Sequence, residues 1–303
     1  MRAFHRTAFA FAFALTAQAA LAADTVAVDT ARGVVEVPNQ PETVAVFDIA
    51  ALDTINALGI SVAGAPQRLY VDYLENATSN AEPVGSLFEP DFEAINALSP
   101  DLIIAGGRSS RQVDALNELA PAIDMTIWGD GLLDQAKARF LAYGKIFGKE
   151  AEAQGLADKL DAKVSEIKGQ TADAGKALIV LTNGSKVSVY GKDSRFGWLH
   201  TELGWAPAIE DVKASTHGEA ISFEFIRETN PDWLIVVDRA AAIGQDAALA
   251  AETLNNKLVA ETTAWKSGQV IYLNAAKVYI AAGGYQSTMD TLDALSSALQ
   301  KNN

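Results

Sequence analysis

The chain contains the stretch Glu93-Ala-Ile-Asn-Ala-Leu-Ser-Pro100-Asp101-Leu-Ile-Ile-Ala-Gly-Gly-Arg108, and the same spacing returns in Glu224-Phe-Ile-Arg-Glu-Thr-Asn-Pro231-Asp232-Trp-Leu-Ile-Val-Val-Asp-Arg239. In both copies Pro-Asp lies seven residues after the Glu, and an Arg lies fifteen residues after it. Each copy predicts a short helix that ends at Pro-Asp, then a buried strand, then an Arg where the strand stops. Because there is one copy in each half, the spacing predicts two similar lobes.

Strands and helices are expected to alternate on both sides of a central helical region, which indicates an α/β fold. No strand-like run occurs between Leu132 and Thr171, whereas apolar residues recur there at helical spacing. A helix from Lys149 to Gln170 would be about 33 Å long at ~1.5 Å per residue, long enough to connect two lobes. The alternative is an ordinary amphipathic helix that stays on one lobe. We expect the bridge, because the segment lies between the two repeat copies.

The domain organisation follows from this pattern. A basic start, an apolar run from Ala8 to Leu15 and the small residues Ala20-Leu-Ala22 predict a secretory signal peptide over residues 1–22. The expected remainder is an N-terminal lobe over 23–148, a bridging helix over 149–171 and a C-terminal lobe over 172–303. The chain has no Cys, so we expect an exported periplasmic protein without a lipid anchor on that residue.

Composition excludes several function classes. A formal net charge of −14 disfavours nucleic acid as a partner, since phosphate backbones require a basic face. The absence of Cys removes disulfides, thiolate metal sites and Cys nucleophiles. Beyond the expected signal peptide the only histidines are His200 and His217, too few for a dedicated zinc or manganese site. No Gly-x-Ser-x-Gly, phosphate-binding Gly-rich loop or His-Glu-x-x-His motif is present, so we do not expect an enzyme.

Arginine is scarce enough to be informative in so acidic a chain. Of eight Arg after residue 22, Arg108, Arg195 and Arg239 lie next to small residues near the expected ends of strands. Arg195 is expected to begin a helix over 195–203 with Ser194 as its N-cap. In open α/β sheets ligands bind beyond the carboxyl ends of the strands, so these cations could form one anion pocket. The alternative is that each Arg pairs with a local carboxylate, such as Asp193 or Asp238.

The repeated acidic residues Glu93 and Glu224 also have two interpretations. They could be ordinary solvated residues of the two helices. Alternatively, they form a matched acidic pair, one on each lobe, that docks on a basic partner.

These residues carry a resemblance that covers essentially the whole chain after the expected signal peptide. It resembles a periplasmic substrate-binding protein of an iron–siderophore ABC importer, with two lobes joined by a long helix, and within that class the catecholate-binding branch. The most specific stretches are Pro100-Asp101-Leu-Ile-Ile-Ala-Gly-Gly-Arg108-Ser-Ser, Tyr190-Gly-Lys-Asp-Ser-Arg195-Phe-Gly, Thr216-His217-Gly218, Val236-Val237-Asp238-Arg239 and Val278-Tyr279-Ile-Ala-Ala-Gly-Gly284.

The resemblance implies a role for each matching position. Arg108, Arg195 and Arg239 would surround an anionic ferric catecholate. His217 and Tyr279 would complete the coordination of iron when the siderophore leaves sites open. Taken singly, His217 could instead be a capped or core histidine, and Tyr279 a strand-end aromatic that packs on its lobe.

The resemblance also implies partners and an activity. Glu93 and Glu224 match the carboxylates that family members present to Arg of the membrane permease. We therefore expect a monomer that binds a ferric catecholate siderophore, has no permanently bound cofactor and delivers its ligand to an ABC permease. The alternatives are haem or another anionic iron chelate as cargo, a periplasmic enzyme acting on an acidic small molecule, and a receptor for free metal ions.

Overall fold

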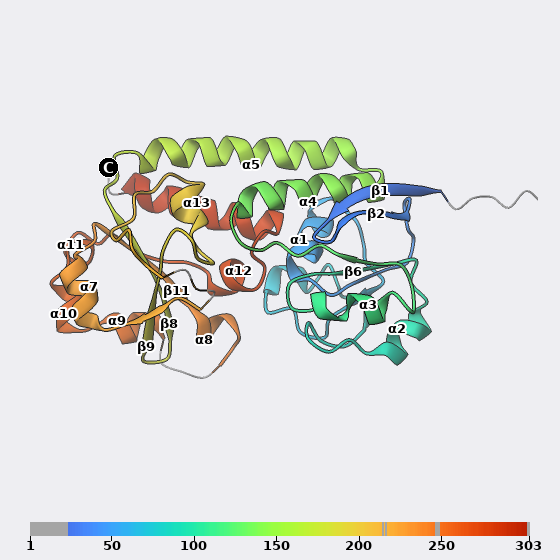
Figure 1. The fold of residues 1–303 in the computed structure, drawn as a ribbon, viewed down its shortest axis with the longest axis horizontal. Helices are drawn as coiled ribbons and strands as arrows, with labels where there is room; N and C mark the ends of the chain where they lie inside the picture. Colours follow the sequence, from blue (N-terminus) through green and yellow to red (C-terminus); the bar gives the residue numbers. More distant parts are fainter. Residues whose placement is uncertain (1–23, 214, 216, 246–248, 302–303) are drawn as a thin grey trace, which may run out of the picture.

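The computed structural model describes residues 24–213, 215, 217–245 and 249–301, and it contains two α/β lobes with a long helix running along both of them (Figure 1). The expected signal peptide over 1–22 lies outside the described residues. The long helix is α5 (Glu150–Thr171), close to the predicted bridge. The prediction of two α/β lobes is confirmed, whereas the division at 23–148, 149–171 and 172–303 stays a prediction.

The N-terminal lobe begins with an antiparallel hairpin of β1 (Thr25–Thr30) and β2 (Gly33–Pro38). A parallel sheet in the order β5-β4-β3-β6-β7 follows. Its strands are β3 (Val44–Val46), β4 (Gly64–Ala65), β5 (Glu82–Pro83), β6 (Leu102–Ala105) and β7 (Ala122–Asp124). The helices of this lobe are α1 (Ile49–Ala57), η1 (Asp72–Leu74), α2 (Phe92–Leu98), η2 (Ser110–Gln112), α3 (Val113–Leu116) and α4 (Leu132–Phe147).

The C-terminal lobe contains a mixed sheet in the order β10-β9-β8-β11-β12, in which β8, β11 and β12 are parallel. Its strands are β8 (Ala177–Asn183), β9 (Lys186–Tyr190), β10 (Glu219–Ile221), β11 (Trp233–Asp238) and β12 (Val270–Tyr272). Its helices are α6 (Trp198–Thr201), α7 (Phe223–Thr229), α8 (Arg239–Ala242), α9 (Ala250–Leu254), α10 (Lys257–Ala260), α11 (Thr263–Lys266), α12 (Ala275–Tyr279) and α13 (Tyr285–Lys301).

The central strands β6 and β11 are buried on both faces, which explains their continuous apolar sequences. In β6, Leu102 and Ile104 pack into one core cluster, whereas Ile103 packs into another. In β11, Ile235 and Leu234 are divided between two clusters in the same way. Both faces of each sheet are therefore buried. Polar residues can then follow the carboxyl ends of the strands, outside the two faces.

The repeated spacing corresponds to the same local structure in both lobes. Helices α2 and α7 each end at a left-handed residue before the Pro, Ser99 with φ 49° and Asn230 with φ 43°. The following Asp then accepts hydrogen bonds from the start of the neighbouring strand region: Asp101 from Thr43 N at 2.8 Å, and Asp232 from Lys176 N at 2.8 Å. The Asp of each copy thus sets the register of its strand.

Helix α5 is the segment of chain that joins the two lobes, and a second long helix packs beside it. Helix α13 packs along α5 and also against α1 of the N-terminal lobe (Figure 1). Lys163 of α5 forms an ion pair with Asp293 of α13 at 2.8 Å, and Gln170 donates to Ser296 Oγ at 3.0 Å. The last helix of the range expected for the C-terminal lobe therefore also belongs to the connection between lobes.

The buried carboxylate of Asp53 in α1 holds the start of α13. It accepts hydrogen bonds from Gln286 N at 2.6 Å, from Ser287 N at 2.9 Å and from the Tyr73 hydroxyl. Gly284 allows this approach, because a Cβ there would lie 2.7 Å from the Asp53 side chain. A carboxylate at a helix N-terminus satisfies free backbone N–H groups and opposes the positive end of the helix dipole.

We expect Asp53 to make stability depend on pH in a direction opposite to that of a surface ion pair. Burial raises the pKa of Asp53 from 3.8 to about 6, so the folded protein binds this proton more tightly than the unfolded chain. Stability from this group should rise as pH falls from 7 to 5, by about 1 kcal/mol. Urea unfolding of wild type and Asp53→Asn at both pH values checks this. The free energy of unfolding of wild type, relative to that of the variant, should increase by about 1 kcal/mol from pH 7 to pH 5. An unchanged difference would contradict the prediction.

Candidate functional site

Two of the predicted arginines lie where two central strands end. Arg108 follows β6 after Gly106 and Gly107, and Gly107 adopts φ 52°, a conformation that favours glycine. Arg239 is the first residue of α8 and directly follows β11. The two copies of the repeat therefore deliver one cation each to the carboxyl edge of a sheet, as the spacing predicts.

The third arginine, Arg195, lies in a turn and not at the start of a helix. The predicted helix over 195–203 is wrong at its beginning, because α6 spans only Trp198–Thr201. Ser194 does not cap it; its hydroxyl donates to Gly191 O at 2.5 Å. A Cβ on Gly197 would lie 1.8 Å from Lys192 O, so the chain folds back tightly here. This turn points Arg195 toward the other lobe's residues.

All three arginines contact one residue, Tyr279, the last residue of α12. Arg108 and Arg195 donate to its backbone carbonyl at 3.2 and 2.8 Å, and Arg239 donates to its hydroxyl at 3.3 Å. The Arg195 guanidinium also lies 4.0 Å from the centre of the Tyr279 ring. The interpretation of Tyr279 as a strand-end aromatic is wrong, because a helix C-terminus presents its carbonyl to the two cations.

The alternative in which local carboxylates neutralise these arginines is not what the structure shows. Asp238 caps α8 by accepting from Ala241 N at 3.1 Å and also accepts from Ala250 N at 2.7 Å. Within the part of the chain that the structure describes, no ion pair within 4.0 Å involves Arg108, Arg195 or Arg239. Their positive charge therefore faces the space between the lobes.

Burial and the close approach of Arg108 and Arg195 shift the pKa values of groups around Tyr279. Burial lowers the pKa of Arg195, and the nearby Arg108 lowers it further, while Tyr279 opposes both effects. Burial raises the pKa of Tyr190 to about 12, with Tyr279 adding to the rise. An anion placed among these groups would relieve the repulsion between the arginines.

The arginines line a cleft between the two lobes. One cavity of about 240 Å³ contains Asp48, Arg108, Arg195, His217 and Tyr279 among its lining residues. A second of about 340 Å³ shares His217 and Tyr279 with it and adds Arg239. His217 is exposed on the turn before β10, so the structure brings all five predicted ligand-binding residues to adjoining cavities.

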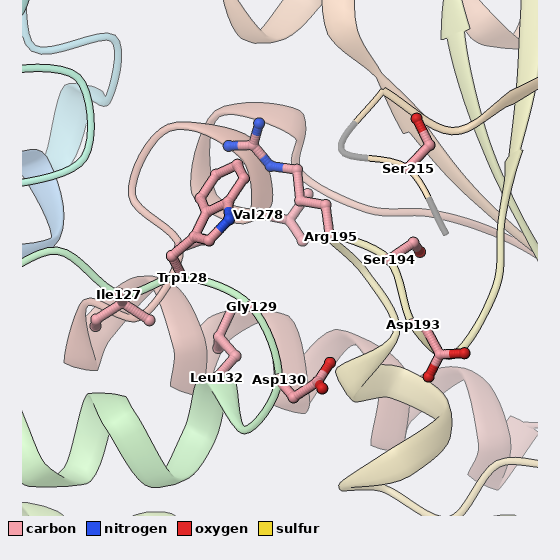
Figure 2. Close-up of a pocket in the computed structure, with 11 residues that line it drawn as sticks. Ile127, Trp128, Gly129, Asp130, Leu132, Asp193, Ser194, Arg195, Ser215 and Val278 are labelled. Carbon is pink, nitrogen blue, oxygen red and sulfur yellow. The ribbon is translucent and has the colours of Figure 1, made fainter. Parts of the chain in front are cut away.

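A third cavity continues the cleft beyond Arg195. It has a volume of about 260 Å³ and shares Ile127, Trp128 and Arg195 with the first cavity. Figure 2 shows the Arg195 guanidinium beside the indole of Trp128, whose ring centre is 5.9 Å away. Trp128 is 57% exposed, which is unusual for so large an apolar side chain.

Sequence reasoning missed Trp128 and Asp48 as residues of the cleft. Trp128 lies four residues beyond the end of β7 at Asp124. Asp48 is the N-cap of α1. Neither has a local signal for function, because both reach the cleft through the packing of one lobe against the other.

The predicted docking residues lie on separate lobes, and neither is among the residues that line the cavities of the cleft. Glu93 is in the first turn of α2 and Glu224 in the first turn of α7, and both are exposed. The two helices lie toward opposite ends of the molecule (Figure 1). Their equivalent positions follow from the repeat, since each helix occupies the same place in its lobe.

Among the described residues, no group of three or more His, Cys, Asp or Glu is arranged to hold a metal ion. No described helix is long and apolar enough to cross a membrane. The described residues thus form two α/β lobes with an arginine-lined cleft between them.

Comparison with known proteins identifies the family. The chain belongs to the Periplasmic binding protein family, whose model matches residues 44–276. It is therefore a substrate-binding transport protein and not an enzyme.

Two curated relatives align over most of the chain. The petrobactin-binding protein YclQ of Bacillus subtilis is 36% identical over 88% of this chain and 85% of its own. The ferric-anguibactin-binding protein FatB of Vibrio anguillarum is 34% identical over 85% and 82%. The crystal structure of the periplasmic catecholate-siderophore binding protein VctP of Vibrio cholerae matches with a TM-score of 0.84 and 31% identity, covering 90% of this chain and 100% of that one.

Proposed function

We propose that the protein captures a ferric catecholate siderophore in the periplasm and delivers it to an ABC permease for iron uptake. The observation that carries the proposal is the convergence of Arg108, Arg195 and Arg239 on Tyr279, without an ion-pair partner in the described residues. The names of the relatives above state binding of petrobactin, of ferric anguibactin and of a catecholate siderophore, and they support the same class of ligand.

The chemistry of the ligand suits this cleft. Fe(III) is a hard ion that prefers anionic oxygen donors, so catecholate complexes are anionic. Each Arg–anion pair at ~6 Å contributes about 3 kcal/mol at an effective dielectric of ~20. The Debye length of ~8 Å at physiological salt screens the diffuse negative surface of the chain more than it screens these nearby charges.

We further propose that His217 and Tyr279 complete the coordination of iron when a tetradentate siderophore leaves two sites open. Both side chains line the two adjoining cavities of the cleft. A phenolate oxygen and an imidazole nitrogen are established protein ligands of iron. The iron is transported cargo, which binds and dissociates as part of the ferric siderophore complex.

A fluorescence-quenching titration tests the proposed function, because the chain has five Trp and Trp128 lies in the cleft. A ferric tetradentate bis-catecholate, a ferric hydroxamate and haem are compared with the purified protein. Quenching by the catecholate alone at submicromolar concentration is the expected result. Binding of haem or of the hydroxamate alone would keep the fold and replace the cargo, and no binding by any of the three would overturn the anion site.

Permease docking gives a second prediction. Glu93→Lys combined with Glu224→Lys should abolish most uptake of ferric siderophore by cells that depend on this protein, since a like charge would oppose Arg of the permease. Affinity for the ligand in solution should not change, because both residues are exposed and lie outside the cleft. The control is Glu36→Lys with Glu118→Lys, two exposed residues outside α2 and α7. Equal uptake by the two double variants would remove Glu93 and Glu224 from docking.

A further inference from the structure

Among the described residues, three carboxylates line the cavities of the cleft, and two of them, Asp130 and Asp193, lie in the cavity beyond Arg195. The third, Asp48, is one that the proposed binding of an anion does not explain. Asp48 follows β3 and lines the same cavity as Arg108, Arg195 and Tyr279. A negative charge in a cavity meant for an anion opposes binding, so its presence requires a reason.

The geometry fixes this carboxylate against the loop that carries Arg108. Its Oδ1 accepts from Ala51 N at 2.9 Å and so caps α1. Its Oδ2 lies beside Gly106 and Gly107, where an added Cβ would come within 3.2 and 3.3 Å of it. Asp48 forms no ion pair within 4.0 Å in the described part of the chain.

Helix capping alone does not call for an aspartate here. Asn and Ser cap a helix about as well as Asp and bring no charge into the cleft. Burial raises the pKa of Asp48, whereas the hydrogen bond from Ala51 and the charge of Arg108 oppose that rise. The charged form of Asp48 is therefore favoured by Arg108 and by a pH above neutral.

Resting on the function proposed above, we propose that Asp48 limits the negative charge that the cleft accepts and selects ferric bis-catecholates over ferric tris-catecholates. Three catecholate dianions around Fe(III) leave about three negative charges, whereas two leave about one. Repulsion by a fixed carboxylate grows in proportion to the charge of the complex. Ligation by the Tyr279 phenolate would bring the bis-catecholate complex to about two negative charges. Asp48 therefore penalises the tris-catecholate about 1.5 to 3 times as strongly in free energy as the bis-catecholate.

The test measures the affinity of wild type and Asp48→Asn for a tetradentate ferric bis-catecholate and a hexadentate ferric tris-catecholate at pH 8. Asn keeps the cap and removes the charge. The affinity for the tris-catecholate should rise about tenfold and that for the bis-catecholate about two- to fivefold, so the preference shifts by about two- to fivefold. Asp48→Ser, which also caps, should give the same shift.

The matched control is Asp91→Asn, which makes the same change at the N-cap of α2, where Asp91 accepts from Ala94 N at 3.0 Å. It should leave both affinities unchanged. Equal changes for the two complexes in Asp48→Asn, or no change at all, would overturn the role of Asp48 and leave the function standing. Failure of wild type to bind either complex would overturn the proposed function, and this inference with it.

Discussion

Replacing Arg195 by alanine is expected to weaken the binding of a ferric bis-catecholate by about a hundredfold. Arg195 donates to Tyr279 O at 2.8 Å and lines two of the cavities of the cleft. The loss of one ion pair of about 3 kcal/mol corresponds to roughly two decades in Kd. Fluorescence-quenching titration of wild type and variant measures the change.

Arg227→Ala provides the control for charge. Arg227 lies in α7, pairs with Glu228 at 3.6 Å and has a side chain that is 38% exposed. Its removal changes the net charge of the protein by the same amount but should alter affinity by less than about twofold, since exposed pairs contribute little. Similar affinities for the Arg195 and Arg227 variants would exclude Arg195 from the site. Arg239→Ala should weaken the binding of the ferric bis-catecholate, as Arg195→Ala does, and by more than Arg227→Ala does.

Asp53→Ala is expected to be the most destabilising of the substitutions considered, at about 3 kcal/mol. Its side chain is fully buried and satisfies the N–H groups of Gln286 and Ser287 together with the Tyr73 hydroxyl. Alanine leaves these donors buried without an acceptor, and each such group costs about 1–3 kcal/mol. Urea unfolding at pH 7 should show a lower midpoint for the variant.

Asp91→Ala is the matched comparison, because Asp91 caps α2 from an exposed position. The loss of an ordinary N-cap costs about 1 kcal/mol. If the two alanine variants lose the same stability, Asp53 acts only as a cap and does not join α1 to α13. A larger loss for Asp53→Ala supports the second connection between the lobes.

The repeat explains why part of the site could be predicted. Strand–helix alternation and the recurring distance from Glu to Pro-Asp to Arg are local properties, so they placed Arg108 and Arg239 at strand ends. The resemblance added Arg195, His217 and Tyr279. The local structure expected around two of these was wrong, because the turn of Arg195 depends on the close approach of Gly197 to Lys192, and Tyr279 ends a short helix.

The sequence by itself determined the two-lobed α/β fold, the bridging helix and the strand-end arginines, because periodicity and spacing express the backbone's own repeat distances. Only the tertiary structure decided that three arginines meet at one carbonyl, that Asp48 faces them and that α13 forms a second link. These contacts join residues far apart in the chain, such as Asp53 and Gln286, which are separated by 233 positions. No local pattern records such a pair, since it forms only when the packing of whole elements brings the two ends together.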